Sequence, residues 1–254
     1  MNDLSVIIIT RNRLEKLKRC IDSLKMKLSE AEIIVVDNGS NDGTVKYFKN
    51  NHGIKLIALD SNIGVAGGRN AGLERCSSSF TVFIDDDAWI ENLDFTKVRE
   101  YFISHPDVGI IAPRILYPNG DLQESIRSFP TLSALLWRGT GLYKLFPNVS
   151  WYRRYINNNT SNIHSVDWAI GACLIIRREL IDSIGHFDKR FSLVYDDVDY
   201  CYRARKADYL TVYWPDACIY HEYTRISSKG FNIDLWRHIK SIIRFFLKKT
   251  NWLS

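Results

Sequence analysis

The stretch VFIDDDAWI, residues 82–90, places three aspartates directly after a run of apolar residues. The apolar residues 82–84 are typical of the end of a buried strand, so the aspartates at 85–87 crowd the tip of that strand. Two carboxylates about 4 Å apart repel each other by about 4 kcal/mol at an effective dielectric constant of about 20. Either a bound cation offsets this repulsion, or the three side chains point in different directions.

Strand and helix patterns alternate up to this stretch. Four apolar runs predict strands, at residues 5–10, 32–37, 54–60 and 80–87. Between them lie a helical periodicity at 14–26, a short helix at 44–51 and a glycine-rich turn that leads into a helix at 62–76. Strands separated by helices predict right-handed crossovers and a parallel sheet, which is an α/β fold. Ligands of such sheets bind beyond the carboxyl ends of the strands.

The second half of the chain is less regular. Residues 117–165 are rich in Asn, Ser, Pro and aromatic residues, and we expect irregular structure with some helix there. A strand and a helix follow at 171–188, and residues 195–209 start acidic and end basic, which suits the dipole of a helix. Residues 210–221 predict one or two further strands that end at a histidine. We therefore predict one domain over residues 1–224.

Composition narrows the class of protein. With 254 residues and 46% hydrophobic residues, the chain can bury a large core. Its longest apolar runs are far shorter than the roughly 20 residues of a membrane span, and its apolar start is interpreted as a first strand and not as a signal peptide. Five scattered cysteines without a C-x-x-C motif are typical of reduced thiols. These features predict a cytoplasmic protein.

The positive charge is confined to the C-terminal tail, residues 225–254. This tail has a net charge of +6 and the first 224 residues have a net charge of −1, which argues against a nucleic-acid-binding protein. The tail predicts a helix over 231–249 with an apolar stripe and with basic residues three or four positions apart; the stripe is Leu235, Ile239, Ile242, Ile243 and Phe246. This pattern fits a basic amphipathic helix that contacts a membrane peripherally, and equally a helix packed on the body with its basic face in water.

Four polar motifs each have a functional and a purely structural interpretation. One aspartate of 85–87 would suffice as a helix cap, whereas three at a strand tip suggest ligands of Mg²⁺ or Mn²⁺. The acids that begin the helix at 195–209 either stabilise it, for example by pairing Asp199 with Arg203, or face the cleft. His221 is either a hydrogen-bonded residue or a metal ligand. The glycines of 62–76 either simply start a helix or bind a dinucleotide, and since they lack the G-x-G-x-x-G spacing they support the dinucleotide site only weakly.

In their order and spacing, six segments resemble the successive motifs of the family-two inverting glycosyltransferases. They are SVIIITRNR, IIVVDNGSNDGT, NIGVAGGRNAGL, FIDDDAWI, GHFDKRFSLVYDDVDYCYRARKADY and PDACIYH, and the resemblance runs from about residue 4 to residue 221. It implies the GT-A fold, which is a Rossmann-like, mostly parallel mixed sheet flanked by helices. The second half is most similar to the rhamnosyltransferase and galactofuranosyltransferase branch. The implied reaction moves a sugar from a nucleotide sugar to an acceptor hydroxyl in cell-surface polysaccharide or glycolipid assembly.

The resemblance also implies roles for residues on the donor side. The positions that correspond to nucleoside, base and phosphate contacts are Thr10, Arg11, Asp37, Asn62 and Arg69, and Asp86 belongs with this substrate-binding set. Asp85 should reach the ribose or the metal, Asp87 should ligate Mg²⁺ or Mn²⁺, and His221 should complete the metal site. A cation bound with a diphosphate would then offset the repulsion among the aspartates.

On the acceptor side, the resemblance makes Asp197 the catalytic base. The acid before it is Asp196 where the family has Glu, and its role stays open. Trp168 and Gly171 fall in the segment that borders the acceptor, although Trp168 equally fits a core position. The implied acceptor is a saccharide or a lipid-linked saccharide, for which contact of the tail with the inner face of the cell membrane would be useful.

Two other classes compete with this interpretation. A nucleotidyltransferase that makes nucleotide sugars needs a glycine-rich, basic triphosphate loop near the first strand, and TRNRLEKL has no glycine. A non-catalytic sugar-binding module would not need a base at Asp197. The sequence leaves the donor sugar, the acceptor and the oligomeric state open.

Overall fold

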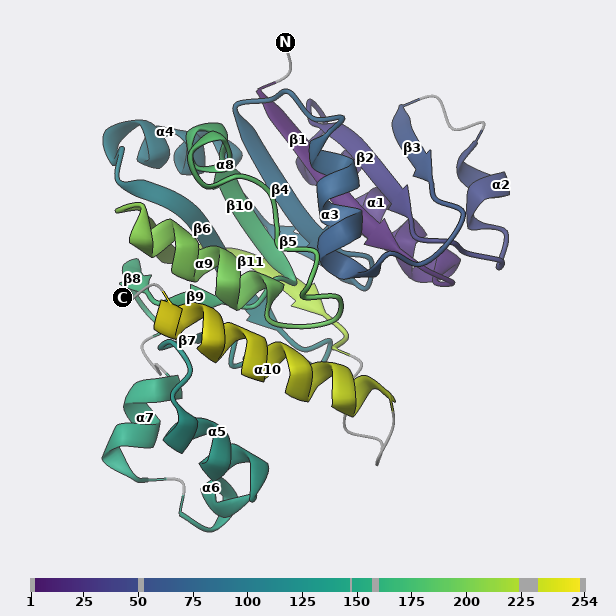
Figure 1. The fold of residues 1–254 in the computed structure, drawn as a ribbon. Helices are drawn as coiled ribbons and strands as arrows, with labels where there is room; N and C mark the ends of the chain where they lie inside the picture. Colours follow the sequence, from purple (N-terminus) through teal and green to yellow (C-terminus); the bar gives the residue numbers. More distant parts are fainter. Residues whose placement is uncertain (1–2, 50–52, 147, 157–159, 224–232, 252–254) are drawn as a thin grey trace.

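The computed structural model describes residues 3–49, 53–146, 148–156, 160–223 and 233–251. Most of its strands form one sheet that runs through the molecule (Figure 1). These strands are β1 (Leu4–Thr10), β2 (Glu32–Asp37), β3 (Ile54–Ala58), β4 (Phe80–Asp85), β5 (Ala88–Asn92), β6 (Val108–Leu116), β8 (His164–Val166), β10 (Cys173–Arg177) and β11 (Leu210–His221). The strand order is β3-β2-β1-β4-β10-β6-β11-β5, with β8 paired to β11. A separate pair joins β7 (Ile126–Arg127) to β9 (Trp168–Ala169).

Helices cover both faces of the sheet because successive strand side chains point to opposite faces. Val6 and Ile8 of β1 pack in the core under one set of helices, and Ile7 packs in the core under the other. The first set is α1 (Leu14–Lys27), α2 (Thr44–Phe48) and α4 (Phe95–Ser104). The second set is α3 (Gly64–Leu73), α8 (Arg178–Ile184), α9 (Asp196–Lys206) and α10 (Ile233–Asn251). The sheet is therefore buried on both faces, as its apolar strands predict.

The four predicted N-terminal strands are confirmed, and they are parallel. β1 lies between β2 and β4, and β2 pairs with β3. The second half makes the sheet mixed, since β10 runs antiparallel to both β4 and β6. The strands β5 and β6 and the helix α4 were not predicted from the sequence. The mostly parallel mixed sheet expected from the resemblance is thus confirmed.

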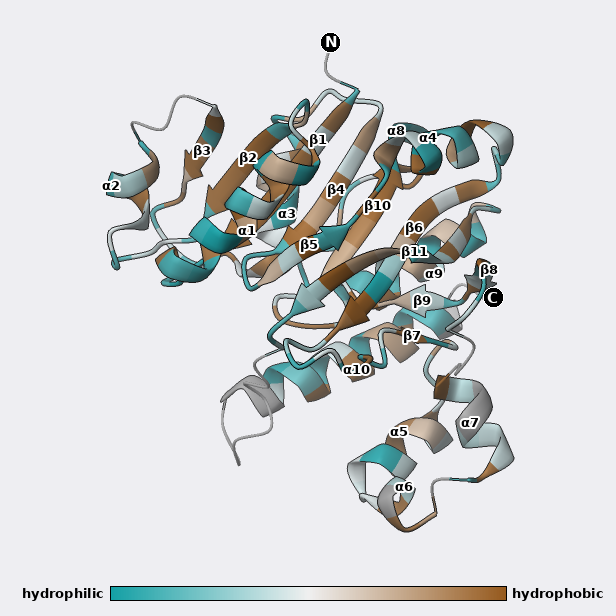
Figure 2. Cartoon of the chain, turned by 180° about the vertical axis from the view of Figure 1, so that it is seen from behind, coloured by the Kyte–Doolittle hydropathy of each residue, from teal (hydrophilic) through white to brown (hydrophobic). Residues whose placement is uncertain are grey.

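Residues 117–165 contain a helical projection below the sheet (Figures 1 and 2). Its helices are α5 (Leu132–Gly139), α6 (Leu142–Leu145) and α7 (Ser150–Ile156). Ala134, Tyr152 and Tyr155 form a small core of their own, separate from the two clusters that flank the sheet. The expectation of irregular structure with some helix is confirmed for the described part of this segment, which also contains β7 and most of β8.

Helix α10 packs on the body of the protein. Its Phe245 is 1% exposed and lies in the cluster with residues of α9. Ile242 and Phe246 are half-buried against the same cluster, whereas Ile239 and Ile243 are exposed, so the predicted apolar stripe is split between core and solvent. The predicted domain boundary after residue 224, and Arg225 and Lys229 of the tail, lie outside the described residues. No helix in the described part of the chain is long and apolar enough to cross a membrane.

Candidate active site

Strand register gathers the predicted polar residues at one edge of the sheet. The pairing of β1 with β2 places Thr10 beside Asp37, and its pairing with β4 places Ile9 beside Asp85. Because these strands are parallel, their carboxyl ends open at the same edge. The turn after Asp85 leads into β5, which pairs Ala88 with His221 at the end of β11. Residues far apart in the sequence thus meet at this edge.

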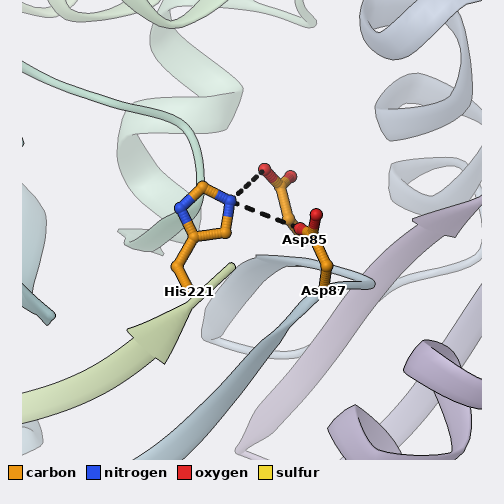
Figure 3. A group of neighbouring side chains, drawn as sticks. All are labelled: Asp85, Asp87 and His221. Atoms are coloured by element: carbon orange, nitrogen blue, oxygen red, sulfur yellow. Dashed lines mark ion pairs between the residues drawn. The ribbon is translucent and has the colours of Figure 1, made fainter. Parts of the chain in front are cut away.

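Asp85, Asp87 and His221 form a cluster that could hold a divalent cation (Figure 3). His221 Nε2 lies 3.3 Å from Asp87 Oδ1 and 3.8 Å from Asp85 Oδ2. The candidate ligand atoms all lie within 4.8 Å of one another. The side chains of Asp87 and His221 are buried, and that of Asp85 is 41% exposed, which leaves one side open to a substrate. Carboxylate and imidazole ligands in this arrangement fit Mn²⁺ or Mg²⁺.

The orientation of His221 is fixed by Gln123, a residue that carried no signal in the sequence. His221 Nδ1 lies 3.1 Å from Gln123 Oε1, and Gln123 Nε2 donates to the backbone oxygen of His221 at 2.6 Å. The contact leaves Nε2 toward the carboxylates, as expected of a metal-binding histidine. Burial lowers the pKa of His221, but the hydrogen bond with Asp87 and the charge of Asp85 raise it above its ordinary value overall. Burial raises the pKa of the Asp87 carboxyl, but the hydrogen bond with His221 and the charges of His221, Arg13 and Lys16 together lower it below its ordinary value.

Asp86 is not one of the candidate ligands and instead joins the end of β1 to the residue just before α1. It accepts hydrogen bonds from Thr10 Oγ1 at 2.8 Å and from Arg13 Nη1 at 2.9 Å. The same Arg13 nitrogen lies 3.1 Å from Asp87 Oδ2. Burial raises the pKa of Asp86 to about 6, against the opposing charge of Arg13. The three aspartates of residues 85–87 therefore divide into two that face His221 and one that is paired with neighbouring elements.

The predicted nucleoside side of the site lies at the ends of β1 and β2. Asp37 is 1% exposed, and its Oδ2 accepts from the backbone N–H of Ser40 at 3.0 Å. Its Oδ1 is buried without a hydrogen-bond partner in the described part of the chain. Asn62 lies beside it, where its Oδ1 accepts from Asn38 Nδ2 at 3.0 Å. Arg11 is exposed at the end of β1.

Arg69 lies between Asp85 of the candidate metal cluster and Asp196, the residue before the predicted base. It is 3% exposed, and its Nη1 lies 2.6 Å from Asp196 Oδ2. Its Nη2 donates to the backbone oxygen of Gly171 at 2.7 Å and lies 3.8 Å from Asp85 Oδ1. Burial raises the pKa of Asp196 despite the charge of Arg69. Asp196 is therefore enclosed by protein, and Arg69 is already paired on three sides.

Asp197 lies at the first turn of α9 and is held by the backbone of Gly171. The N–H of Gly171 donates to Asp197 Oδ2 at 2.8 Å. Tyr195, just before the helix, has φ 75°, a left-handed conformation that is costly for a bulky residue and occurs at functional sites. Trp168 is 6% exposed and donates from Nε1 to the backbone oxygen of Ser128 at 2.8 Å, so it occupies a core position. The predicted acceptor contacts of Gly171 and Trp168 stay predictions.

Comparison with known proteins agrees with this geometry. A family model described as Glycosyl transferase family 2 matches residues 5–185. The chain belongs to this family. The resemblance noted from its motifs to a glycosyltransferase family is therefore confirmed. The match covers the strand tips, the aspartates of residues 85–87, Arg69 and Gly171, and it ends before Asp197 and His221.

Two curated relatives of the chain are named for the transfer of a sugar. The low-salt glycan biosynthesis hexosyltransferase Agl10 of Haloferax volcanii is 28% identical over 81% of the chain and 62% of the relative. The N-acetylglucosaminyl-diphospho-decaprenol L-rhamnosyltransferase of Mycobacterium tuberculosis is 26% identical over 95% of the chain and 83% of the relative. The chain thus spans less than two thirds of the first relative and most of the second.

A solved structure supports the GT-A-like fold. The mannosyltransferase PcManGT from Pyrobaculum calidifontis, solved in complex with GDP-Man and Mn²⁺, superimposes with a TM-score of 0.64 at 18% identity. The superposition covers 98% of the chain and 64% of that structure. At this identity the likeness concerns the fold alone.

Proposed function

We propose that this glycosyltransferase is metal-dependent and inverting, and that it moves a sugar from a nucleoside diphosphate sugar to an acceptor hydroxyl. One observation carries the proposal. Asp85 and Asp87 meet His221 at the carboxyl edge of the sheet, and Arg69 connects this cluster to the segment that holds Asp197. A site for the leaving diphosphate and a candidate base are thus parts of one connected site.

The donor side fits a nucleotide. The unpartnered Oδ1 of Asp37 needs an N–H donor, which a nucleobase can supply, since a buried acceptor left unpaired costs about 1–3 kcal/mol. Asp85, Asp87 and His221 would hold Mg²⁺ or Mn²⁺, which, when bound, neutralises charge on the leaving diphosphate. The Mn²⁺ and GDP-Man in the complex of the mannosyltransferase support this assignment.

The acceptor side needs a base, and Asp197 is the candidate. Its carboxylate takes the proton of the acceptor hydroxyl while the acceptor oxygen bonds to the anomeric carbon and the bond from that carbon to the diphosphate oxygen breaks. Such proton removal contributes about 10²–10⁴-fold to the rate. A single displacement of this kind inverts the anomeric configuration. The hydrogen bond from Gly171 orients the carboxylate, and Asp196 is enclosed and paired with Arg69, so it is a poorer candidate.

We infer that the acceptor is a saccharide or a lipid-linked saccharide in cell-surface polysaccharide or glycolipid assembly. The mycobacterial relative is named for a lipid-diphosphate acceptor and for L-rhamnosyl transfer, which supports a rhamnosyl-type donor; a galactofuranosyl-type donor belongs to the same branch. A lipid-linked acceptor would place the enzyme at the cytoplasmic face of the membrane.

Slow donor hydrolysis tests the proposal without knowledge of the acceptor. The protein is incubated with a panel of UDP-, dTDP- and GDP-sugars, and release of the nucleoside diphosphate is measured with Mn²⁺ and with excess chelator. We expect release from one donor class, dependent on the metal. Formation of pyrophosphate from a nucleoside triphosphate and a sugar 1-phosphate would instead indicate a nucleotidyltransferase. Donor or sugar binding with no turnover of any donor would indicate a sugar-binding module.

A further inference from the structure

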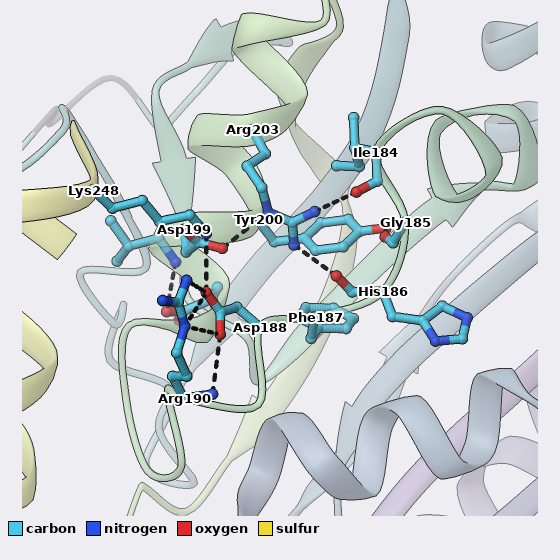
Figure 4. Close-up of polar contacts among 12 residues, drawn as sticks. Ile184, Gly185, His186, Phe187, Asp188, Arg190, Asp199, Tyr200, Arg203 and Lys248 are labelled. Atoms are coloured by element: carbon cyan, nitrogen blue, oxygen red, sulfur yellow. Dashed lines mark hydrogen bonds and ion pairs between the residues drawn. The ribbon is translucent and has the colours of Figure 1, made fainter. Parts of the chain in front are cut away.

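Helix α10 is anchored to the helix that carries the candidate base. The ring of Phe245 lies 5.7 Å from that of Tyr195 and 5.6 Å from that of Tyr202, measured between centroids. Lys248 Nζ lies 2.6 Å from Asp199 Oδ1 and 3.1 Å from Asp188 Oδ2 (Figure 4). One face of α10 is therefore committed to the body of the protein.

The opposite face of α10 is apolar and open to solvent. Its side chains lie three and four positions apart, so they line one side of the helix. We call this surface the outer face; it consists of Trp236, Ile239, Ile243 and Leu247, which are 61%, 36%, 53% and 61% exposed. The basic residues Arg237 and Lys240 are exposed next to it. If α10 served only to pack on the body of the protein, its large apolar side chains would face inward. The outer face is therefore not explained by the packing of α10 on the body.

A second exposed apolar surface lies on the helical projection. We call it the α5–α6 tip; it consists of Leu132, Leu136, Leu145 and Phe146, which are between 56% and 73% exposed. Both views of the molecule place α5 and α6 beyond α10, at the lower end of the fold (Figures 1 and 2). Apolar side chains grouped on the surface in this way mark sites of interaction.

We propose that the outer face of α10 and the α5–α6 tip bind the surface of a membrane that contains anionic lipids. This inference rests on the proposed lipid-linked acceptor, whose lipid lies in such a membrane. Aromatic and aliphatic side chains bordered by basic residues are the chemistry that an anionic lipid interface accepts. Helix α10 itself holds five Lys/Arg and one Asp, a net charge of +4, so a symmetric contact between two copies of this helix would place like charges together.

Because α10 is anchored to α9, deletion of the tail is a poor test of the proposed membrane-binding surface. Deleting the tail would also remove Phe245 and Lys248 from α9, so loss of binding or activity would have two explanations. Substitutions of exposed side chains avoid this problem. The test variants are Trp236→Gln/Ile243→Gln for the outer face and Leu136→Gln/Leu145→Gln for the α5–α6 tip. The matched control is Ile103→Gln, an equally exposed apolar residue on α4, 60% exposed.

The measurement is co-sedimentation of the full chain with vesicles of phosphatidylcholine, with and without phosphatidylglycerol. We expect binding to the anionic vesicles that weakens with added salt, about tenfold weaker binding for each double variant, and no change for the control. Arg237→Gln/Lys240→Gln should weaken binding to the anionic vesicles alone, by about fivefold per charge. Equal binding of both double variants and the unsubstituted protein would overturn the proposal.

Two further readouts separate this inference from the proposed function. Donor hydrolysis by the double variants should equal that of the unsubstituted protein, because the substituted side chains lie outside the active site. Vesicle binding that persists while no donor is hydrolysed would refute the proposed function and leave the membrane surface supported. Light scattering shows whether a second copy covers this surface instead. If the unsubstituted protein is a dimer that does not bind vesicles, and the outer-face variant is a monomer, the membrane assignment is overturned.

Discussion

The backbone N–H of Gly171 donates a hydrogen bond of 2.8 Å to Asp197 Oδ2, while the backbone oxygen of the same residue accepts from Arg69. The chain therefore holds the candidate base and the buried arginine through one peptide segment. A Cβ atom added at Gly171 would lie 2.5 Å from Arg69 Nη2, closer than side-chain contacts allow. Position 171 requires glycine because its backbone lies close to the guanidinium of Arg69, and not because of its backbone conformation.

We expect Gly171→Ala to reduce sugar transfer by about 10²-fold, because displacement of Arg69 or of the Gly171 amide misplaces the base. Since the guanidinium is enclosed, it has little room to move away. The measurement is the rate of transfer at saturating donor, beside the affinity for the nucleoside diphosphate. Gly139→Ala is the control, because a Cβ there meets no atom within 4 Å. Normal transfer by Gly171→Ala would show that this close contact does not position Asp197.

Removal of the carboxylate of Asp37 should weaken donor binding with little effect on chemistry. Its free Oδ1 is placed to accept from the nucleobase, and a hydrogen bond to a charged group contributes about 1.5–3 kcal/mol. For Asp37→Ala we therefore expect the KM for the donor to rise by about 10-fold to 100-fold, with kcat changed far less. Asp60→Ala, an exposed aspartate just beyond β3, is the control. A fall in kcat at unchanged KM would assign Asp37 a different role.

Sequence patterns predicted the strands whose residues form continuous apolar runs. β6 was missed although it lies inside the sheet, because it contains Pro113, which removes a backbone donor and argues against a central strand. The structure accommodates Pro113 where the register of β11 shifts after Trp214. Strand order in the second half also depends on pairing between distant segments, which local patterns do not encode.

The candidate metal ligands of the site were predictable from the sequence, whereas the residues that hold them in place were not. Asp85, Asp87 and His221 were expected together, and the structure brings them together. Arg13 and Gln123 were missed because their contacts join residues 73 to 98 positions apart, for which sequence spacing gives no signal. The apolar stripe of α10 was identified, but its division between core and solvent follows from the anchoring of Phe245 and Lys248, which only the packed structure reveals.

Among single substitutions in the cluster, Asp87→Ala should reduce metal-dependent donor turnover the most. Asp87 is the buried carboxylate of the cluster, and it contacts both His221 and Arg13. We expect donor turnover in Mn²⁺ or Mg²⁺ to vanish in this variant and in unsubstituted protein treated with excess chelator. His221→Ala should raise the metal concentration needed for half-maximal activity by at least about 10-fold, because loss of even an outer partner of a metal ligand costs about 10-fold to 100-fold in metal affinity. Full activity in chelator would refute the metal role, and unchanged metal affinity in His221→Ala would remove the histidine from the site.

Lys248→Met should destabilise the fold by about 1–3 kcal/mol, because Asp199 and Asp188 lose a partner while Arg203 still pairs with Asp199. Burial raises the pKa of Asp188, but hydrogen bonds from Arg190 and Lys248 lower it overall. A carboxyl group whose pKa is lower in the folded protein than in the unfolded chain, where it is about 3.9, stabilises the fold at pH values above about 3.9. This stabilisation is lost as the pH falls from about 3.9 toward the lower pKa of the folded state.

The destabilisation by Lys248→Met should therefore be largest near pH 7 and shrink on acidification, as measured by denaturant unfolding at several pH values. Lys240→Met on the exposed side of α10 is the matched control, and it should change stability little. Equal stability of Lys248→Met and the unsubstituted protein at pH 7 would show that the network around Asp199 does not anchor the helix.

The last prediction concerns Asp197 as the base. Asp197→Asn keeps the size of the side chain and an oxygen that accepts from Gly171, but an amide cannot readily take a proton. We expect sugar transfer to fall by about 10²–10⁴-fold while donor affinity, measured by calorimetry, changes far less. Asp182→Asn, an exposed position on α8, is the control for the same chemical change.

Product stereochemistry tests the same step independently of the rate. A hydroxyl that attacks opposite the leaving diphosphate gives a product with the inverted anomeric configuration, which NMR of the isolated glycoside determines. Near-normal transfer by Asp197→Asn would exclude it as the base, and Asp196 or Asp199 would then need testing, although both are buried and paired with arginines. A product that retains the donor configuration would exclude a single displacement, whichever carboxylate proved essential, because retention requires a second displacement or attack from the face of the leaving group.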